Sequence, residues 1–265
     1  MNLMRWKPLF AVLLGLAIVL VTPAVSASHE IVSSDYSYGE NRVMKLSGAL
    51  YKDTGELDPN YDYYAVKITT EDAKYRNSGW VGPMYIYVDV AVLPSSAAEV
   101  PASHVPTSGT KFTQHSVSFS YEGIGFDVQI PRTFVSYWEK NDWAHHFVWE
   151  VSGIKPSFVG WWFVFDDYAE FATGFRVPQS SNVFTAAYAY GEWYKLYLVV
   201  FRKIASDYAV IGMSYLPKKY STYYKVNELK HQICTYNRNI RNIQGLPEMI
   251  KVSPETQSLA GVQKG

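Results

Sequence analysis

Short segments in which apolar and polar residues alternate fill the middle of the chain. From about Arg42 to Tyr215, segments rich in Val, Ile, Tyr, Phe and Trp are separated by Gly, Pro, Asn, Asp and Ser. Alternation with a period of two is typical of a β-strand with one buried face. It is clearest over residues 84–92, where every second residue is Met, Ile or Val. The number of segments predicts an all-β domain over 28–226, an antiparallel β-sandwich that can take a jelly-roll-like form.

The pattern also predicts the register of one hairpin. Two alternating segments flank the dipeptide Glu122-Gly123. With a two-residue loop, all their apolar residues fall on one face and Ser118 lies opposite Asp127. Gly123 can supply the positive φ that such a turn needs. The predicted apolar pairs are Tyr121 with Ile124, Phe119 with Phe126, and Val117 with Val128.

Two segments, 158–165 and 193–201, are apolar almost throughout. Each is predicted to be one strand covered on both faces, either by a helix or loop or by a partner. The stretch from Pro94 to Lys111 is rich in Pro, Ala and Ser, which predicts a long surface loop. The alternative is a linker between two subdomains.

Near the C-terminus the period changes to that of a helix. Asn227 can cap its start, and Gly245 followed by Pro247 can end it, so a helix is predicted over 227–245. We expect it to cover one of the doubly apolar strands; the alternative is a docking helix for a second protein or an anionic surface. Residues 246–265 are polar and small, which predicts a disordered tail. The apolar stripe consists of Leu229, Ile233, Tyr236, Ile240 and Ile243.

The N-terminus has the layout of a secretory signal. Arg5 and Lys7 precede the apolar run Leu9–Val21, and small residues follow at Val25-Ser26-Ala27. This predicts a signal peptide over 1–27 and a secreted or cell-envelope protein. The alternative is an uncleaved anchor. No second long apolar run follows, so no stable membrane span is expected after cleavage.

Charge and cysteine content narrow the class of partner. The chain is formally neutral, and removal of the signal would leave it slightly acidic, so no nucleic-acid partner is expected. Cys234 is the single cysteine and has no disulfide partner within the chain. It lies beside the helical stripe, which predicts a buried, unreactive thiol. The composition does not decide the oligomeric state.

The aromatic residues are the strongest candidates for ligand binding. Tyr and Trp offer flat apolar faces with a polar handle, which suits stacking on sugar rings. Trp161 and Trp162 are neighbours on a predicted strand and should point to opposite sides. The alternative is ordinary packing within the sandwich. The candidate ligand-binding residues are Trp80, Trp138, Trp143, Trp161 and Trp162.

Acidic residues suggest a metal site. Asp58, Asn60 and Asp62 alternate as the oxygen ligands of calcium loops do. The Gly and the closing Glu of an EF-hand loop are absent, and turns favour Asp and Asn for backbone reasons alone. Calcium is therefore a candidate cofactor, and the alternative is an ordinary turn.

A second set of acids could perform glycoside hydrolysis, in which two carboxylates act as acid and base or nucleophile. The set consists of Glu150, Asp166, Asp167 and Glu170. No other catalytic pattern stands out. His145 and His146 are adjacent on a predicted strand and should face opposite ways, which does not suit one metal ion.

These observations favour a non-catalytic protein that binds a carbohydrate or another cell-surface polymer, in the manner of a lectin. One alternative is a secreted glycoside hydrolase that uses the carboxylates above. The other is a structural protein of a surface assembly.

Overall fold

The computed structural model describes residues 29–76, 78, 80–94, 103–108, 116–130, 134–152, 157–159, 162–164, 168–197, 200–217 and 223–244. Several sequence predictions fall outside these residues. They are the signal peptide 1–27, the tail 246–265 with Gly245, most of the predicted loop after Pro94, and the side chains of Trp161, Asp166 and Asp167.

Two five-stranded sheets form the body of the molecule. Sheet A has the order β1 (His29–Tyr38), β2 (Met44–Asp53), β3 (Tyr61–Asp72), β12 (Tyr168–Pro178) and β5 (His104–Val105). Sheet B has the order β14 (Val200–Tyr215), β13 (Val183–Tyr197), β4 (Val81–Leu93), β9 (His145–Ser152) and β8 (Phe134–Asn141).

Two hairpins and one helix complete the described part of the chain. The hairpins are β6 (Ser116–Tyr121) with β7 (Ile124–Gln129), and β10 (Ser157–Val159) with β11 (Trp162–Val164). The helix is α2 (Tyr223–Gln244). All described strand pairings are antiparallel. The predicted all-β fold with one C-terminal helix is confirmed. Consecutive strands pair in the meander β1–β2–β3, which differs from the jelly-roll order.

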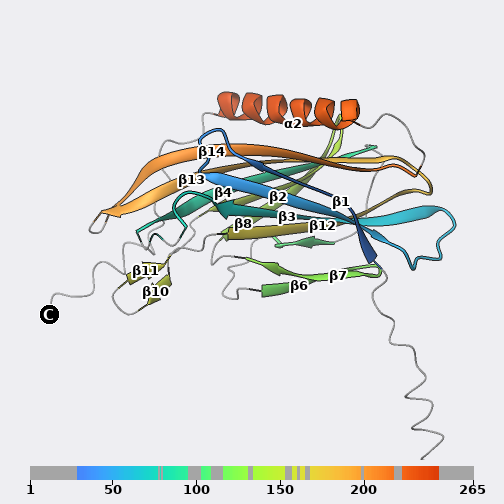
Figure 1. Ribbon diagram of the computed structural model, residues 1–265, viewed down its shortest axis with the longest axis horizontal. Helices are drawn as coiled ribbons and strands as arrows, with labels where there is room; N and C mark the ends of the chain where they lie inside the picture. Colours follow the sequence, from blue (N-terminus) through green and yellow to red (C-terminus); the bar gives the residue numbers. More distant parts are fainter. Residues whose placement is uncertain are drawn as a thin grey trace, which may run out of the picture.

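The elements stack in layers, with α2 at one extreme of Figure 1, hairpin β6–β7 at the other and the two sheets between them. The alternation along β4 shows how the sequence builds these layers. Val88 and Val90 are fully buried in the main core. Ala91 points the other way, into a smaller core beneath α2. Sheet B is therefore buried on both faces where the helix covers it.

Hairpin β6–β7 has the register expected from the sequence. Tyr121 pairs with Ile124, Phe119 with Phe126, and Val117 with Val128. Its apolar face packs on sheet A, where the Phe126 ring lies 4.8 Å from that of Tyr51. The positive φ falls on Glu122 (43°) and not on Gly123 as expected. Gly123 is needed for close approach, because a Cβ there would lie 2.9 Å from each carboxylate oxygen of Asp53.

The two continuous apolar segments were wrongly predicted as single strands. Segment 158–165 holds hairpin β10–β11, in which Phe158 pairs with Phe163. Segment 193–201 contains the reversal between β13 and β14, and Tyr197 pairs with Val200. In the second case the sequence between Tyr197 and Val200 is Leu198-Val199, so the pattern has no polar residue or glycine there to indicate a reversal.

Helix α2 begins one turn earlier than predicted, at Tyr223, so Asn227 lies within the helix and does not cap it. Leu229 and Ile233 of the apolar stripe are buried against sheet B. The helix was expected to cover segment 158–165 or 193–201, but its buried partners on the sheet are Ala91, Phe184, Ala186 and Tyr188, outside both segments. The helix crosses β14 closely at Gly212. A Cβ on Gly212 would lie 2.6 Å from Cγ1 of Val226, so the absence of a side chain sets the separation of helix and sheet.

Candidate functional site

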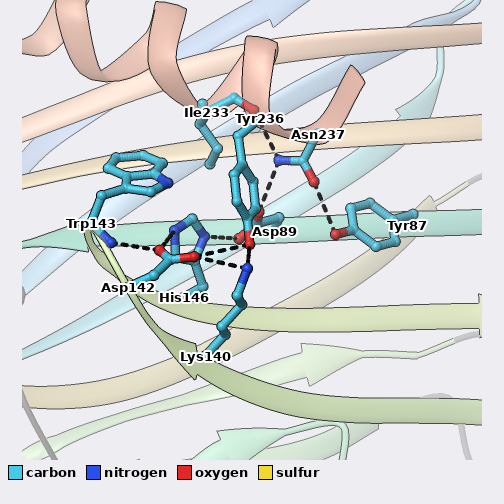
Figure 2. A network of polar contacts seen from close by, with 9 residues as sticks. All are labelled: Tyr87, Asp89, Lys140, Asp142, Trp143, His146, Ile233, Tyr236 and Asn237. Carbon is cyan, nitrogen blue, oxygen red and sulfur yellow. Dashed lines mark hydrogen bonds and ion pairs between the residues drawn. The ribbon is translucent and has the colours of Figure 1, made fainter. Parts of the chain in front are cut away.

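A buried polar cluster connects α2 to sheet B, and Figure 2 shows its members. At its centre Asp89 of β4 is fully buried. Its Oδ1 lies 2.9 Å from Nδ1 of His146, and its Oδ2 accepts a hydrogen bond of 2.8 Å from Nδ2 of Asn237. Asn237 belongs to α2 and also donates to the carbonyl oxygen of Ile233 (2.9 Å), while its Oδ1 accepts from the Tyr87 hydroxyl (2.9 Å).

The cluster continues outward from His146 to the surface. Nε2 of His146 lies 3.2 Å from Oδ1 of Asp142, an ion-pair contact without hydrogen-bond geometry. Nζ of Lys140 lies 2.8 Å from Oδ2 of Asp142, which raises the pKa of Lys140. The imidazole is held between two rings, with the Tyr236 ring stacked 5.0 Å away and the Trp143 ring edge-on at 4.8 Å.

This arrangement is suited to holding the helix and not to catalysis. Asp89, His146 and Asn237 are at most 1% exposed, so no substrate reaches them. Asp89 and Asn237 use their side-chain polar atoms on His146, on each other, on Tyr87 and on the Ile233 carbonyl. His145 faces the other way, as expected, and its Nε2 lies 3.0 Å from Oε2 of Glu139.

Cys234, also on α2, is half-buried in the core beneath the helix. Burial raises the pKa of its thiol, which disfavours the reactive thiolate. The described geometry gives Cys234 a packing role.

The five candidate tryptophans occupy different environments. Trp80 and Trp138 are each 40% exposed. Trp143 packs against His146 and Tyr236 beneath α2. Trp161 lies outside the described residues, and Trp162 lies in β11 with its side chain not described.

The described carboxylates of the hydrolase hypothesis lie on opposite outer faces of the sandwich. Glu150 is on the helix side of sheet B, opposite Tyr87. Glu170 is on the hairpin side of sheet A, where Oε2 lies 3.0 Å from Nζ of Lys67 and accepts from the Gln129 amide (2.8 Å). These two residues therefore cannot act as a catalytic pair.

The residues of the calcium hypothesis form a hydrogen-bonded turn. The two oxygens of Asp58 accept from the Asn60 amide (2.8 Å) and from the Tyr63 hydroxyl (2.9 Å). Asp62 uses one oxygen for Lys52 (3.1 Å) and the other for the Ser180 amide (2.9 Å). Within the described residues no group of three or more His, Cys, Asp and Glu is arranged to hold a metal ion. Calcium binding stays a prediction.

Glu56 in the same turn gives a pH-dependent prediction. Burial and the nearby carboxyl of Asp62 raise the pKa of Glu56 to about 7. Because the folded protein binds this proton more tightly than the unfolded chain, the stabilisation is complete below pH 4.5 and is lost as pH rises through about 7. In Glu56→Gln we expect this part of the pH dependence to disappear. Urea denaturation of both proteins across this range measures the difference, and parallel profiles would contradict it.

A pocket of about 400 Å³ lies beside the first turns of α2. Phe184 and Leu229 supply apolar walls, and Lys225, Glu228 and Gln232 line it with polar groups. Nζ of Lys225 lies 5.5 Å from the centre of the Phe184 ring. The positive charge of Lys225 is therefore already engaged in a cation–π contact within the pocket.

Exposed apolar side chains lie near the end of the β13–β14 hairpin at which the chain passes from β13 to β14. We call Trp80, Tyr197, Val200 and Ile204 the hairpin tip; they are 40%, 46%, 54% and 38% exposed. Tyr197 and Val200 are directly opposite each other. Trp80 is adjacent, since its carbonyl oxygen accepts from the Leu196 amide (2.9 Å). Ile204 is the extra residue of a β-bulge, because Trp193 pairs with Ala205 and Tyr194 with Lys203.

Comparisons with known proteins place the chain in no family: no family model matches it, and no curated protein does. One solved structure, titled "Pore forming protein", is 11% identical with a TM-score of 0.38, covering 71% of this chain and 96% of that one. Another, the membrane-inserted NetB toxin of Clostridium perfringens, is 8% identical with a TM-score of 0.34, covering 71% and 97%. At these TM-scores the similarity assigns neither family nor function, so function is inferred from this chain's own residues.

Proposed function

We propose that this is a non-catalytic protein that binds the surface of a lipid membrane through the hairpin tip. The observation that carries the proposal is the exposure of Tyr197 and Val200 at the reversal of two long strands. A hairpin end in water ordinarily has polar or glycine-containing turn residues. In this sequence the two residues between Tyr197 and Val200 are Leu198 and Val199, which are both apolar.

The side chains at the tip suit the boundary between headgroups and hydrocarbon. Trp and Tyr favour that boundary because each combines an apolar ring with a polar group. Val200 and Ile204 would add apolar area removed from water. In the described part of the chain no helix is long and apolar enough to cross a membrane. Attachment to the membrane surface through the hairpin tip requires no such helix.

The test is sedimentation of the full chain with lipid vesicles, comparing it with the triple variant Trp80→Ala/Tyr197→Ser/Val200→Ser. Each of the three side chains loses about 1 kcal/mol of transfer free energy, so membrane partitioning should fall by roughly a hundredfold. The control is Ile31→Ser/Tyr36→Ser, which removes two exposed apolar residues from β1 and should leave partitioning unchanged. A full chain that stays in the supernatant would contradict the proposal.

Carbohydrate binding is a second candidate, favoured by the exposure of Trp138 on β8. Its ring lies 6.4 Å from the Tyr87 ring, and the polar residues Glu139 and Lys140 follow it. A glycan array with the full chain tests this candidate: the absence of any bound glycan would remove it, and binding that survives Trp138→Ala would remove the role of Trp138. The surface-assembly alternative predicts a mass that rises with concentration in light scattering.

A further inference from the structure

Two basic residues stand directly behind the exposed pair of the hairpin tip. Lys195 of β13 and Arg202 of β14 are cross-strand partners, two residues from Tyr197 and Val200 respectively. Residues two apart on a strand, and residues directly opposite, share one face of the sheet. Lys195, Tyr197, Val200 and Arg202 therefore form one four-residue surface.

Both cations lie close to the same aromatic ring. Nζ of Lys195 is 5.1 Å, and Cζ of Arg202 is 5.9 Å, from the centre of the Tyr197 ring. These contacts keep the two charged groups near each other at the edge of the apolar pair. Like charges directly opposite on a sheet are unfavourable, so the arrangement calls for an anion.

The anion is not supplied by the part of the chain that the structure describes. Neither Lys195 nor Arg202 takes part in an ion pair with another described residue. The nearby carboxylate of Glu192 is bonded to Lys203 (2.6 Å) and to the hydroxyls of Tyr190 (2.8 Å) and Tyr194 (2.9 Å).

We propose that Lys195 and Arg202 bind the net negative headgroup of an anionic phospholipid while Tyr197 and Val200 enter the membrane boundary. This inference rests on the proposed function and names its lipid class. A guanidinium binds phosphate oxygens in bidentate fashion, and an ammonium adds a second charge. The apolar neighbours favour a lipid over a free phosphate, since a soluble anion would leave Tyr197 and Val200 in water.

The experiment compares vesicles of phosphatidylcholine alone with vesicles that also contain phosphatidylserine. The full chain should bind the second kind more tightly, by roughly tenfold at low ionic strength and less at physiological salt. Lys195→Gln/Arg202→Gln should remove that difference and leave binding to phosphatidylcholine unchanged. Inorganic phosphate should not compete; if it displaces the protein at concentrations that barely alter ionic strength, the site recognises the free anion and the lipid assignment is wrong.

The control variant is Arg176→Gln/Lys225→Gln. It removes the same number of charges, and both residues also lie over aromatic rings, those of Tyr61 and Phe184. It should keep the preference for phosphatidylserine. Equal binding of the full chain to both vesicles would overturn this inference and leave the proposed function standing. Binding to neither would overturn both.

Discussion

Replacing Asp89 by alanine should lower the free energy of unfolding by about 3–5 kcal/mol, the usual cost of removing one partner from a buried charged cluster. The change leaves Nδ1 of His146 without its 2.9 Å contact and Nδ2 of Asn237 without its acceptor on β4. Water cannot replace either contact, because both residues are at most 1% exposed. Urea denaturation followed by circular dichroism measures the loss.

A matched control for this variant is Asp127→Ala. Asp127 accepts a 2.9 Å hydrogen bond from Ser118 on the exposed side of hairpin β6–β7. Because that bond competes with water, its loss should cost less than about 1 kcal/mol. If Asp89→Ala lowers the free energy of unfolding by no more than Asp127→Ala does, the cluster does not hold α2 on the sheet.

Replacing Asp207 by alanine should cost about 3 kcal/mol, through backbone groups rather than side chains. Asp207 is 2% exposed, and its oxygens accept the amides of Asn41 (3.1 Å), Val43 (2.8 Å) and Met44 (3.1 Å). Asn41 and Val43 lie in the β1–β2 connection and Met44 begins β2, and the variant leaves the buried N–H groups of Val43 and Met44 without this partner. Thermal and urea denaturation should show the same loss.

A second substitution tests the same contact from the other side. A Cβ on Gly39 would lie 2.1 Å from Oδ2 of Asp207, so Gly39→Ala must push the carboxylate away from its amides. We expect it to destabilise the protein, and to do so much less in the background of Asp207→Ala. Additive effects would contradict the proposed role of Asp207.

The sequence predicted those parts of the fold that follow from local periodicity. Residues 117–128 alternate without interruption, so only one register buries Phe119 and Val128 together. The helical stripe was equally clear, although the first turn of α2 was missed because Asn227 is a good capping residue. Periodicity fails where a reversal falls within an apolar segment, as between Tyr197 and Val200, since nothing in the pattern distinguishes such a reversal from a buried strand.

The polar clusters could not be predicted because their members are distant in sequence. Asp89 and Asn237 are 148 positions apart, and no local pattern relates them. One signal was available: an Asp in the middle of an otherwise apolar strand requires a buried partner. The hairpin tip was missed for the opposite reason, since Tyr197 and Val200 lay in a segment predicted to be covered on both faces.

The most direct test of membrane binding through the hairpin tip is a fluorescent probe at position 200. Val200→Cys in a Cys234→Ser background carries one environment-sensitive dye, and Gln232→Cys on exposed α2 carries the same dye as a reference. Membrane binding through the tip predicts a blue shift of the dye emission at position 200 on addition of phosphatidylserine-containing vesicles, and no shift at position 232. No shift at position 200, or an equal shift at both positions, would contradict it.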